Sequence, residues 1–309
     1  MKNISKKINL VVKVLILIVI ISLFIALYIL NVENVDNSSK LKDNSDEIVN
    51  NESNSWKYII KNEKLYVSNS NNGFHEVPVD INKIIGYDKD TQNINENLYQ
   101  LSKTKIMFLY REDENVKVIT SDNEGINWEN KDLIKNKAQA ESVVYIHFTS
   151  EDDATAIICK DVAMQKAMVK VIQTTDSGSV WKEKKTGPDG YIEVDLKSSY
   201  VFFNSNLGFI SSSKNGGDSS TLYMTKDGGD SFSEVKFPEQ QLSPLNNNIY
   251  LNWSQIYDFP SIPQLKDGEL VVVVSQGADG DYNGGKISAK YISKDMGQSW
   301  EFVEEYVPK

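Results

Sequence analysis

Residues 121–128 read Ser121-Asp122-Asn123-Glu124-Gly125-Ile126-Asn127-Trp128 and are the first of four copies of one eight-residue pattern. In each copy a Ser or Thr is followed two positions later by Asp or Asn, two further on by Gly, and three further on by Trp or Phe. The pattern positions are Ser121, Asn123, Gly125 and Trp128; Thr174, Asp176, Gly178 and Trp181; Thr225, Asp227, Gly229 and Phe232; and Ser293, Asp295, Gly297 and Trp300. Self-similarity of this kind indicates a repeat architecture.

The spacing of the copies predicts the fold. A weaker fifth copy ends in Gly73-Phe74, and the intervals between consecutive glycines of the five copies are mostly close to 50 residues. Such an interval fits one four-stranded blade of a β-propeller with its loops. We therefore predict an all-β fold, a β-propeller of about five four-stranded blades, with a sixth irregular blade as the alternative. The first unit lacks residues for its innermost strand.

Alternating apolar residues around the copies predict individual strands. In the third unit we expect strands at 143–149, 154–159, 168–174 and 180–183. The Pro-rich segment 258–263 is expected to be a loop.

Each residue type in the pattern has a physical role in a turn. The Asp or Asn side chain can accept backbone N–H groups of its own turn. Glycine can adopt a left-handed conformation that a Cβ opposes. The aromatic side chain can bury about 150–250 Å² between neighbouring sheets.

The pattern resembles the Asp-box, or BNR repeat, of sialidase-like β-propellers, and the resemblance covers residues 56–309. It implies that the repeats are architectural and lie on the turn between the third and fourth strands of each blade, away from any active site. We therefore assign no catalytic residue to them. Sialidases bind the substrate carboxylate with three arginines, but Arg111 is the only arginine here. Lysine does not freely replace a bidentate guanidinium, so we predict that the chain is not a sialidase.

The amino-terminal segment has the features of a membrane anchor. Residues 14–30 are apolar apart from Ser22, and the run is just long enough to span a bilayer core. Four lysines precede the run, which by the positive-inside rule places the amino terminus in the cytoplasm. We predict a single-pass signal-anchor in residues 1–32, a flexible polar stalk in 33–55 and an extracytoplasmic propeller in 56–309. A cleaved signal peptide is the alternative. The excess of lysine over arginine, with abundant Asn and Ile, favours a bacterial source.

The charge balance bears on partners. The chain has 43 Asp and Glu against 33 Lys and Arg. Because nucleic-acid affinity depends on basic charge, we expect no nucleic-acid partner. Solubility is the simplest interpretation of the acidity, and attraction of divalent cations is the more specific one.

One segment matches part of a calcium loop. Asp279, Asp281 and Asn283 alternate before Gly284 as in the first half of an EF-hand loop, but Lys290 stands where that loop has glutamate. Two interpretations of this segment are therefore open: a calcium site at these three residues, or an ordinary hairpin turn. Cys159 is expected to be a buried small hydrophobe. The two histidines, His75 and His147, are too far apart in sequence to indicate a triad or a metal site.

The leading interpretation of function is a membrane-anchored binding or scaffold module that presents a propeller face to a protein or a glycan. One alternative is a glycan-active hydrolase with a carboxylate pair in the central funnel. Another is an assembly factor for a membrane complex. Tyr250, Trp253 and Tyr257 could stack on sugar rings, although core packing is their expected role.

Overall fold

The computed structural model describes residues 56–309 except 69–72, 103, 136–141, 188, 215–216, 241–251, 278–279 and 309. The signal-anchor and the stalk predicted for residues 1–55 lie outside the described residues. Within the described part, the secondary structure is almost entirely β-strand, with one four-residue helix, α2 (Trp253–Ile256), and three short 3-10 turns. The all-β class is therefore confirmed. None of the helices described is long and apolar enough to cross a bilayer.

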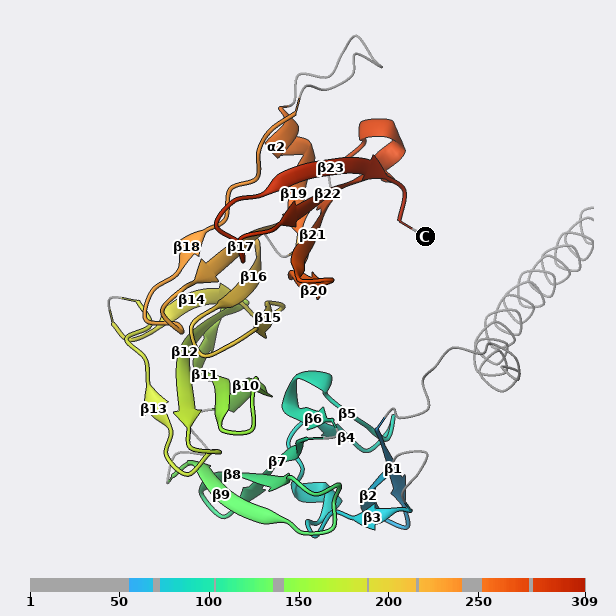
Figure 1. Ribbon diagram of the computed structural model, residues 1–309, viewed down its shortest axis with the longest axis vertical. Helices are drawn as coiled ribbons and strands as arrows, with labels where there is room; N and C mark the ends of the chain where they lie inside the picture. The colour runs from blue at the N-terminus through green and yellow to red at the C-terminus, as the bar shows by residue number, and fades with distance from the viewer. Residues whose placement is uncertain are drawn as a thin grey trace, which may run out of the picture. The chain divides into compact units, whose positions relative to one another are not determined.

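The described strands form five main antiparallel sheets, which we number in chain order, and one two-stranded hairpin (Figure 1). Sheet 1 contains β1 (Lys57–Lys61), β2 (Lys64–Ser68) and β3 (His75–Glu76). Sheet 2 contains β6 (Tyr99–Leu101), β7 (Ile106–Glu112), β8 (Asn115–Ser121) and β9 (Glu129–Ile134). Sheet 3 contains β10 (Ser142–Phe148), β11 (Asp153–Ala163), β12 (Lys166–Thr175) and β13 (Lys182–Glu183), with β14 (Ile192–Asp195) also paired to β12.

The remaining sheets follow the same plan. Sheet 4 contains β15 (Ser199–Phe202), β16 (Gly208–Lys214), β17 (Ser219–Thr225) and β18 (Ser233–Glu234). Sheet 5 contains β19 (Tyr257–Pro260), β21 (Glu269–Gln276), β22 (Ser288–Ser293) and β23 (Glu301–Tyr306), with β20 (Gln264–Lys266) also paired to β21. A small hairpin of β4 (Tyr87–Asp88) and β5 (Asn93–Ile94) lies between sheets 1 and 2 in the sequence. Each of sheets 2 to 5 therefore contains four neighbouring strands joined in chain order.

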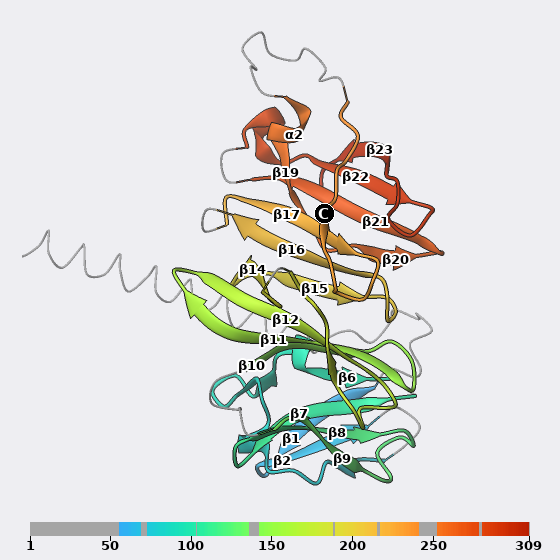
Figure 2. The ribbon, with the colours of Figure 1, turned by 90° about the vertical axis from the view of Figure 1, so that its left-hand side faces the viewer.

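Consecutive sheets lie face to face (Figure 2), and four apolar clusters fill the space between them. In β7, Phe108 belongs to the cluster shared with sheet 1, and its neighbour Leu109 belongs to the cluster shared with sheet 3. Successive side chains of a strand point to opposite faces, so a strand covered on both sides needs a continuous apolar run. Sequential meanders packed in this way are the arrangement of propeller blades. No apolar cluster of the described residues joins sheet 1 to sheet 5.

Sheet 1 contains three strands, one fewer than the four neighbouring strands of each of sheets 2 to 5. The repeated turn joins the third and fourth strands of those sheets, and the corresponding segment of sheet 1, which contains Gly73, joins β2 to β3. By this correspondence β1 matches the second strand of the other sheets. The described part of sheet 1 therefore has no counterpart of their first strand, as the sequence predicts.

The expectation of a loop at 258–263 is wrong for its first half. Tyr257–Pro260 forms β19, the first strand of sheet 5. A proline is tolerated there because β19 is an edge strand, where a missing N–H need not break the ladder. The Pro260 carbonyl accepts hydrogen bonds from Ser211 Oγ at 2.8 Å and Ser220 Oγ at 3.3 Å, which tie β19 to sheet 4.

Candidate functional site

The four repeated turns share one hydrogen-bond pattern. In the third copy, Thr225 Oγ1 accepts the Gly229 N–H at 2.8 Å and donates to Asp227 Oδ1 at 2.7 Å. The same carboxylate oxygen accepts the Ser231 N–H at 2.9 Å. The equivalent bonds in the other three copies are 2.7–3.1 Å long. The Ser or Thr and the Asp or Asn therefore satisfy the backbone donors of the turn between them.

The glycine of each turn lies against the preceding sheet. Gly229 has φ +101°, and a Cβ placed on it would come within 2.7 Å of Val171 in sheet 3. In the same way Gly297 faces Phe209 of sheet 4, and Gly125 faces Val67 of sheet 1. The residue before each glycine also has a positive φ, which the sequence pattern did not indicate. These turns are thus contacts between sheets.

The aromatic residues that end the turns point into the structure. Trp300 is 8% exposed, and Trp128, Trp181 and Phe232 are half-buried against the clusters between sheets. Phe74 of the weaker copy differs, because it is 58% exposed. The aromatic position is therefore used for packing in the four strong copies only.

The turn carboxylates are held in their ionised form. For Asp227, burial opposes ionisation, but hydrogen bonds from Ser231, Thr225 and the backbone outweigh it and lower the pKa to about 2. For Asp295, the Ser299 hydroxyl and backbone N–H lower the pKa to about 2. A carboxylate with such a low pKa is a poor proton donor near neutral pH, which agrees with a structural role for these residues.

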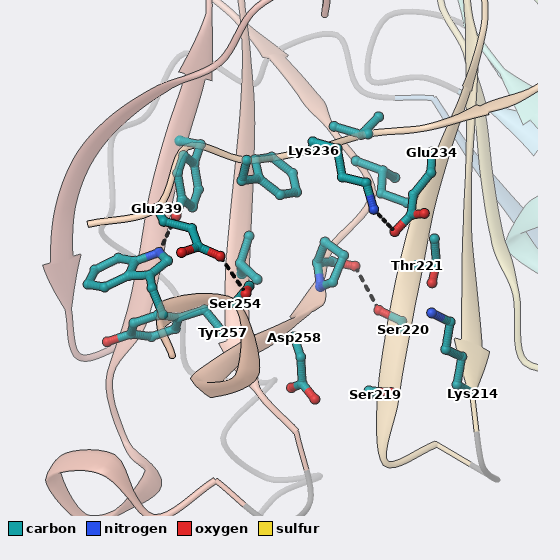
Figure 3. A pocket seen from close by; sticks show the side chains of 17 residues that line it. Lys214, Ser219, Ser220, Thr221, Glu234, Lys236, Glu239, Ser254, Tyr257 and Asp258 are labelled. Atoms are coloured by element: carbon teal, nitrogen blue, oxygen red, sulfur yellow. Dashed lines mark hydrogen bonds and ion pairs between the residues drawn. The ribbon is translucent and has the colours of Figure 1, made fainter. Parts of the chain in front are cut away.

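A cavity of about 360 Å³ lies between sheets 4 and 5 (Figure 3). It is lined by the start of β17 and by the chain that follows β18, together with residues of α2, β19, β21 and β22. The repeated turn at 225–232 joins the other ends of β17 and β18. The cavity is therefore at the end of the hairpin opposite the repeated turn, and it is our candidate functional site.

One side of the cavity is aromatic. Trp253 Nε1 donates to the Tyr291 hydroxyl at 2.6 Å, and that hydroxyl donates to the Pro238 carbonyl at 3.3 Å. The Phe237 ring is half-exposed and lies against the Tyr291 ring, with their centroids 4.7 Å apart and their planes at 39°. Trp253 and Tyr257 are each only 5% exposed and belong to the cluster between sheets 4 and 5, so core packing is their main role. Tyr250 lies outside the described residues.

Charged and hydroxyl side chains line the rest of the cavity (Figure 3). Glu234 pairs with Lys236 at 2.6 Å, and Glu239 accepts the Ser254 hydroxyl at 2.7 Å. Asp258 accepts the Gly277 N–H at 2.8 Å. A concave site with an apolar side and a few polar groups is what a ligand pocket requires. No local sequence signal marks the lining of the cavity, because its residues come from separate segments between Lys214 and Tyr291.

The proposed calcium loop is described only in part. Asp281 precedes the 3-10 turn η3 (Tyr282–Gly285), Asn283 has φ +51°, and Asp279 lies outside the described residues. The Asp281 carbonyl accepts the Gly284 N–H at 2.9 Å, as in a turn. The described residues contain no group of three or more His, Cys, Asp or Glu side chains that could hold a metal ion. Calcium binding at Asp279, Asp281 and Asn283 stays a prediction.

The remaining reactive side chains do not meet at the cavity. Cys159 is buried, and burial raises the pKa of its thiol. His147 lies in β10, where burial lowers the pKa of its imidazole. Arg111 is exposed in β7 of sheet 2. None of these three lines the cavity between sheets 4 and 5.

No protein-family model and no curated protein matches this sequence. Among solved structures, a GH74 enzyme from Niastella koreensis is 13% identical with a TM-score of 0.36, over 79% of this chain and 36% of that one. An oligogalacturonate lyase in complex with manganese is 8% identical with a TM-score of 0.45, over 79% and 59%. The NanB sialidase from Streptococcus pneumoniae is 14% identical with a TM-score of 0.36, over 70% and 32%.

The match therefore spans between 32% and 59% of the length of these three structures. At these identities and TM-scores the likeness concerns the fold alone and carries nothing about activity.

Proposed function

We propose that this chain is a membrane-anchored, extracytoplasmic binding module: an Asp-box β-propeller of five blades that takes a glycan or a segment of a protein in the cavity between sheets 4 and 5. Residues 14–30 would hold it at the membrane, and residues 33–55 would form the stalk. The observation that carries the binding role is the cavity itself, with its half-exposed Phe237 and its polar lining.

The sheets and their turns support the proposal of five blades. Four meanders of four strands and one sheet of three account for the main sheets described. The hairpin of β4 and β5 has only two strands, which is too few for a sixth blade of the same kind. The hydrogen bond from the Ser or Thr to the Asp in three of the repeated turns supports the proposal that these turns are Asp-boxes.

The contacts of the cavity carboxylates with neighbouring protein groups favour binding over catalysis. Glu234, Glu239 and Asp258 each accept a hydrogen bond or an ion pair from a neighbouring protein group. A glycosidase needs two carboxyl groups that are free to act on one substrate, so these contacts with the protein favour binding over catalysis.

The test compares two phenylalanines. The detergent-solubilised full-length chain is applied to a glycan array and used for a pull-down from cell-surface extracts. Phe237→Ala removes the half-exposed ring of the cavity, and Phe74→Ala removes an exposed ring on a repeated turn. We expect Phe237→Ala to weaken binding at least about tenfold, a loss of roughly 1.4 kcal/mol. Equal binding by the two variants, or no captured ligand, would contradict the proposal.

Glycan hydrolysis is the second candidate, because three carboxylates line one cavity. A retaining or inverting glycosidase needs two carboxyl groups roughly 5–10 Å apart. Release of reducing ends from any glycan that the array identifies, abolished in Asp258→Asn or Glu239→Gln, would favour this alternative. Unchanged glycan after prolonged incubation would leave binding as the function.

The membrane anchor has its own test. After alkaline carbonate extraction of the cells that express it, the chain should stay in the membrane pellet. Protease added to intact cells, or to spheroplasts, should remove residues 56–309. A chain that is released by carbonate or protected from the protease would contradict the proposed topology.

A further inference from the structure

Strand β1 is half-exposed where the matching strands are buried. The second strands of the other sheets, β7, β11, β16 and β21, have a strand on each side, and each contains at least two buried apolar residues. In β1, Tyr58, Ile59 and Ile60 are all only half-buried. β2 covers one edge of β1, and no described strand covers the other. The sheet is thus open at the position where its neighbours have their first strand.

The turn after β1 shows which backbone groups face the open edge. Asn62 and Glu63 both have positive φ, which defines a two-residue hairpin and makes Lys61 and Lys64 a hydrogen-bonded pair. Hydrogen-bonded and non-hydrogen-bonded pairs alternate along an antiparallel ladder. The N–H and C=O groups of Tyr58 and Ile60 therefore point away from β2, toward the open edge.

The side chains of β1 offer two different faces to an added strand. Tyr58 and Ile60 pack against the cluster shared with sheet 2, and the Tyr58 ring contacts Tyr99 at 5.2 Å. By strand alternation, Lys57, Ile59 and Lys61 lie on the other face. Both lysines are exposed, and neither has an ion-pair partner in the described part of the chain.

We propose that the open edge of β1 accepts an extended segment of a partner protein as an additional strand. Its side chains should be apolar toward sheet 2 and acidic beside Lys57 and Lys61. Strand addition gains affinity from main-chain hydrogen bonds and specificity from alternate side chains. A second copy of this chain fits poorly, because antiparallel pairing of two β1 edges would place Lys57 opposite Lys61. Lysines on an edge deter such pairing, and they attract an acidic strand.

The probe is a blocked heptapeptide of alternating glutamate and valine, added to the detergent-solubilised full-length chain. A peptide of alternating lysine and valine is the control. We expect the acidic peptide to slow hydrogen exchange of the Tyr58 and Ile60 amides and to bind at least about tenfold more tightly than the basic one.

Two variants test the geometry. Ile60→Pro removes an N–H that faces the open edge and breaks no bond to β2, so it should abolish peptide binding and leave the fold intact. Lys57→Glu with Lys61→Glu leaves the backbone unchanged and should reverse the preference toward the basic peptide. Phe237→Ala should leave peptide binding unchanged, which separates this edge from the cavity.

Three results would overturn the proposal. Tyr58 and Ile60 amides that are protected without peptide would mean that another part of the same chain already covers the edge. Equal binding of the acidic and basic peptides would remove the role of the lysines. Peptide binding that survives Ile60→Pro would show that the peptide does not bind at β1.

Discussion

The hydroxyl of Ser293 accepts the backbone N–H of Gly297 at 2.7 Å and donates to Asp295 at 2.8 Å. Because that N–H is buried, Ser293→Ala should lower the free energy of unfolding by about 1–2 kcal/mol. Urea unfolding of the full-length chain, followed by tryptophan fluorescence, measures the loss. Thr174 and Thr225 make the same bonds in other copies, so Ser293→Thr should stay within about 0.5 kcal/mol of the parent. Equal losses in the two variants would contradict this role.

Replacing a turn glycine with alanine should lower the free energy of unfolding by an amount that depends on what lies beside the new Cβ. Gly229→Ala combines a positive φ with a Cβ 2.7 Å from Val171, so we expect it to destabilise by about 2–5 kcal/mol. Gly268 also has a positive φ, +84°, but nothing lies within 4 Å of its Cβ position. Gly268→Ala should therefore cost only about 1–2 kcal/mol. Similar urea midpoints for the two variants would mean that the close approach to sheet 3 is not important.

The turn aspartates should make the protein sensitive to acid. Asp295 has a pKa lowered to about 2 by the Ser299 hydroxyl and backbone N–H, against about 4 for an unfolded aspartate. Its contribution is thus complete above pH 4 and is lost as the pH falls toward 2. Asp295→Asn should reduce the loss of unfolding free energy between pH 5 and pH 2.5. Asn123→Asp, which places a carboxylate in the first turn, should increase that loss. An unchanged pH dependence in both variants would contradict the assignment.

The turns were predictable because their signal is local. Ser or Thr, Asp or Asn, and Gly lie within five residues, and their hydrogen bonds close within the same turn. The expected strands of the third unit were also near the observed ones, but β11 continues to Ala163 instead of ending near 159. Its last residues are exposed and polar in part, so their pairing with β12 leaves no apolar alternation to detect.

The cavity could not be predicted, because it depends on which segments become neighbours. Ser220 and Phe237 meet residues such as Tyr257 only after sheets 4 and 5 pack together. The sequence also hides β19, since Pro260 and Pro263 suggest a loop, whereas the Pro260 carbonyl is held by two serines of sheet 4. These contacts join residues about 40–50 positions apart, beyond the range of any local pattern.

A buried lysine gives the last prediction. Lys105 is 2% exposed, and its Nζ lies 2.6 Å from the carboxylate of Asp122 and 4.8 Å from the centre of the Phe148 ring. Asp122→Asn would leave a buried ammonium without its counter-ion, at a cost of about 2–3 kcal/mol because Asp122 itself is largely exposed. Lys105→Met removes the charge and keeps the volume, so it should change the unfolding free energy by no more than about 1 kcal/mol.

The double variant decides whether this pair behaves as a buried one. With Lys105→Met already present, Asp122→Asn should add almost nothing, because no buried charge is left unpaired. The exposed pair of Lys64 and Glu76, with Nζ and Oε1 2.9 Å apart, is the control, and Glu76→Gln should leave the urea midpoint almost unchanged. If Asp122→Asn cost no more than Glu76→Gln, the Lys105 ammonium would be solvated, which would contradict its burial. If the cost of Asp122→Asn persisted in the double variant, it would not come from an unpaired ammonium.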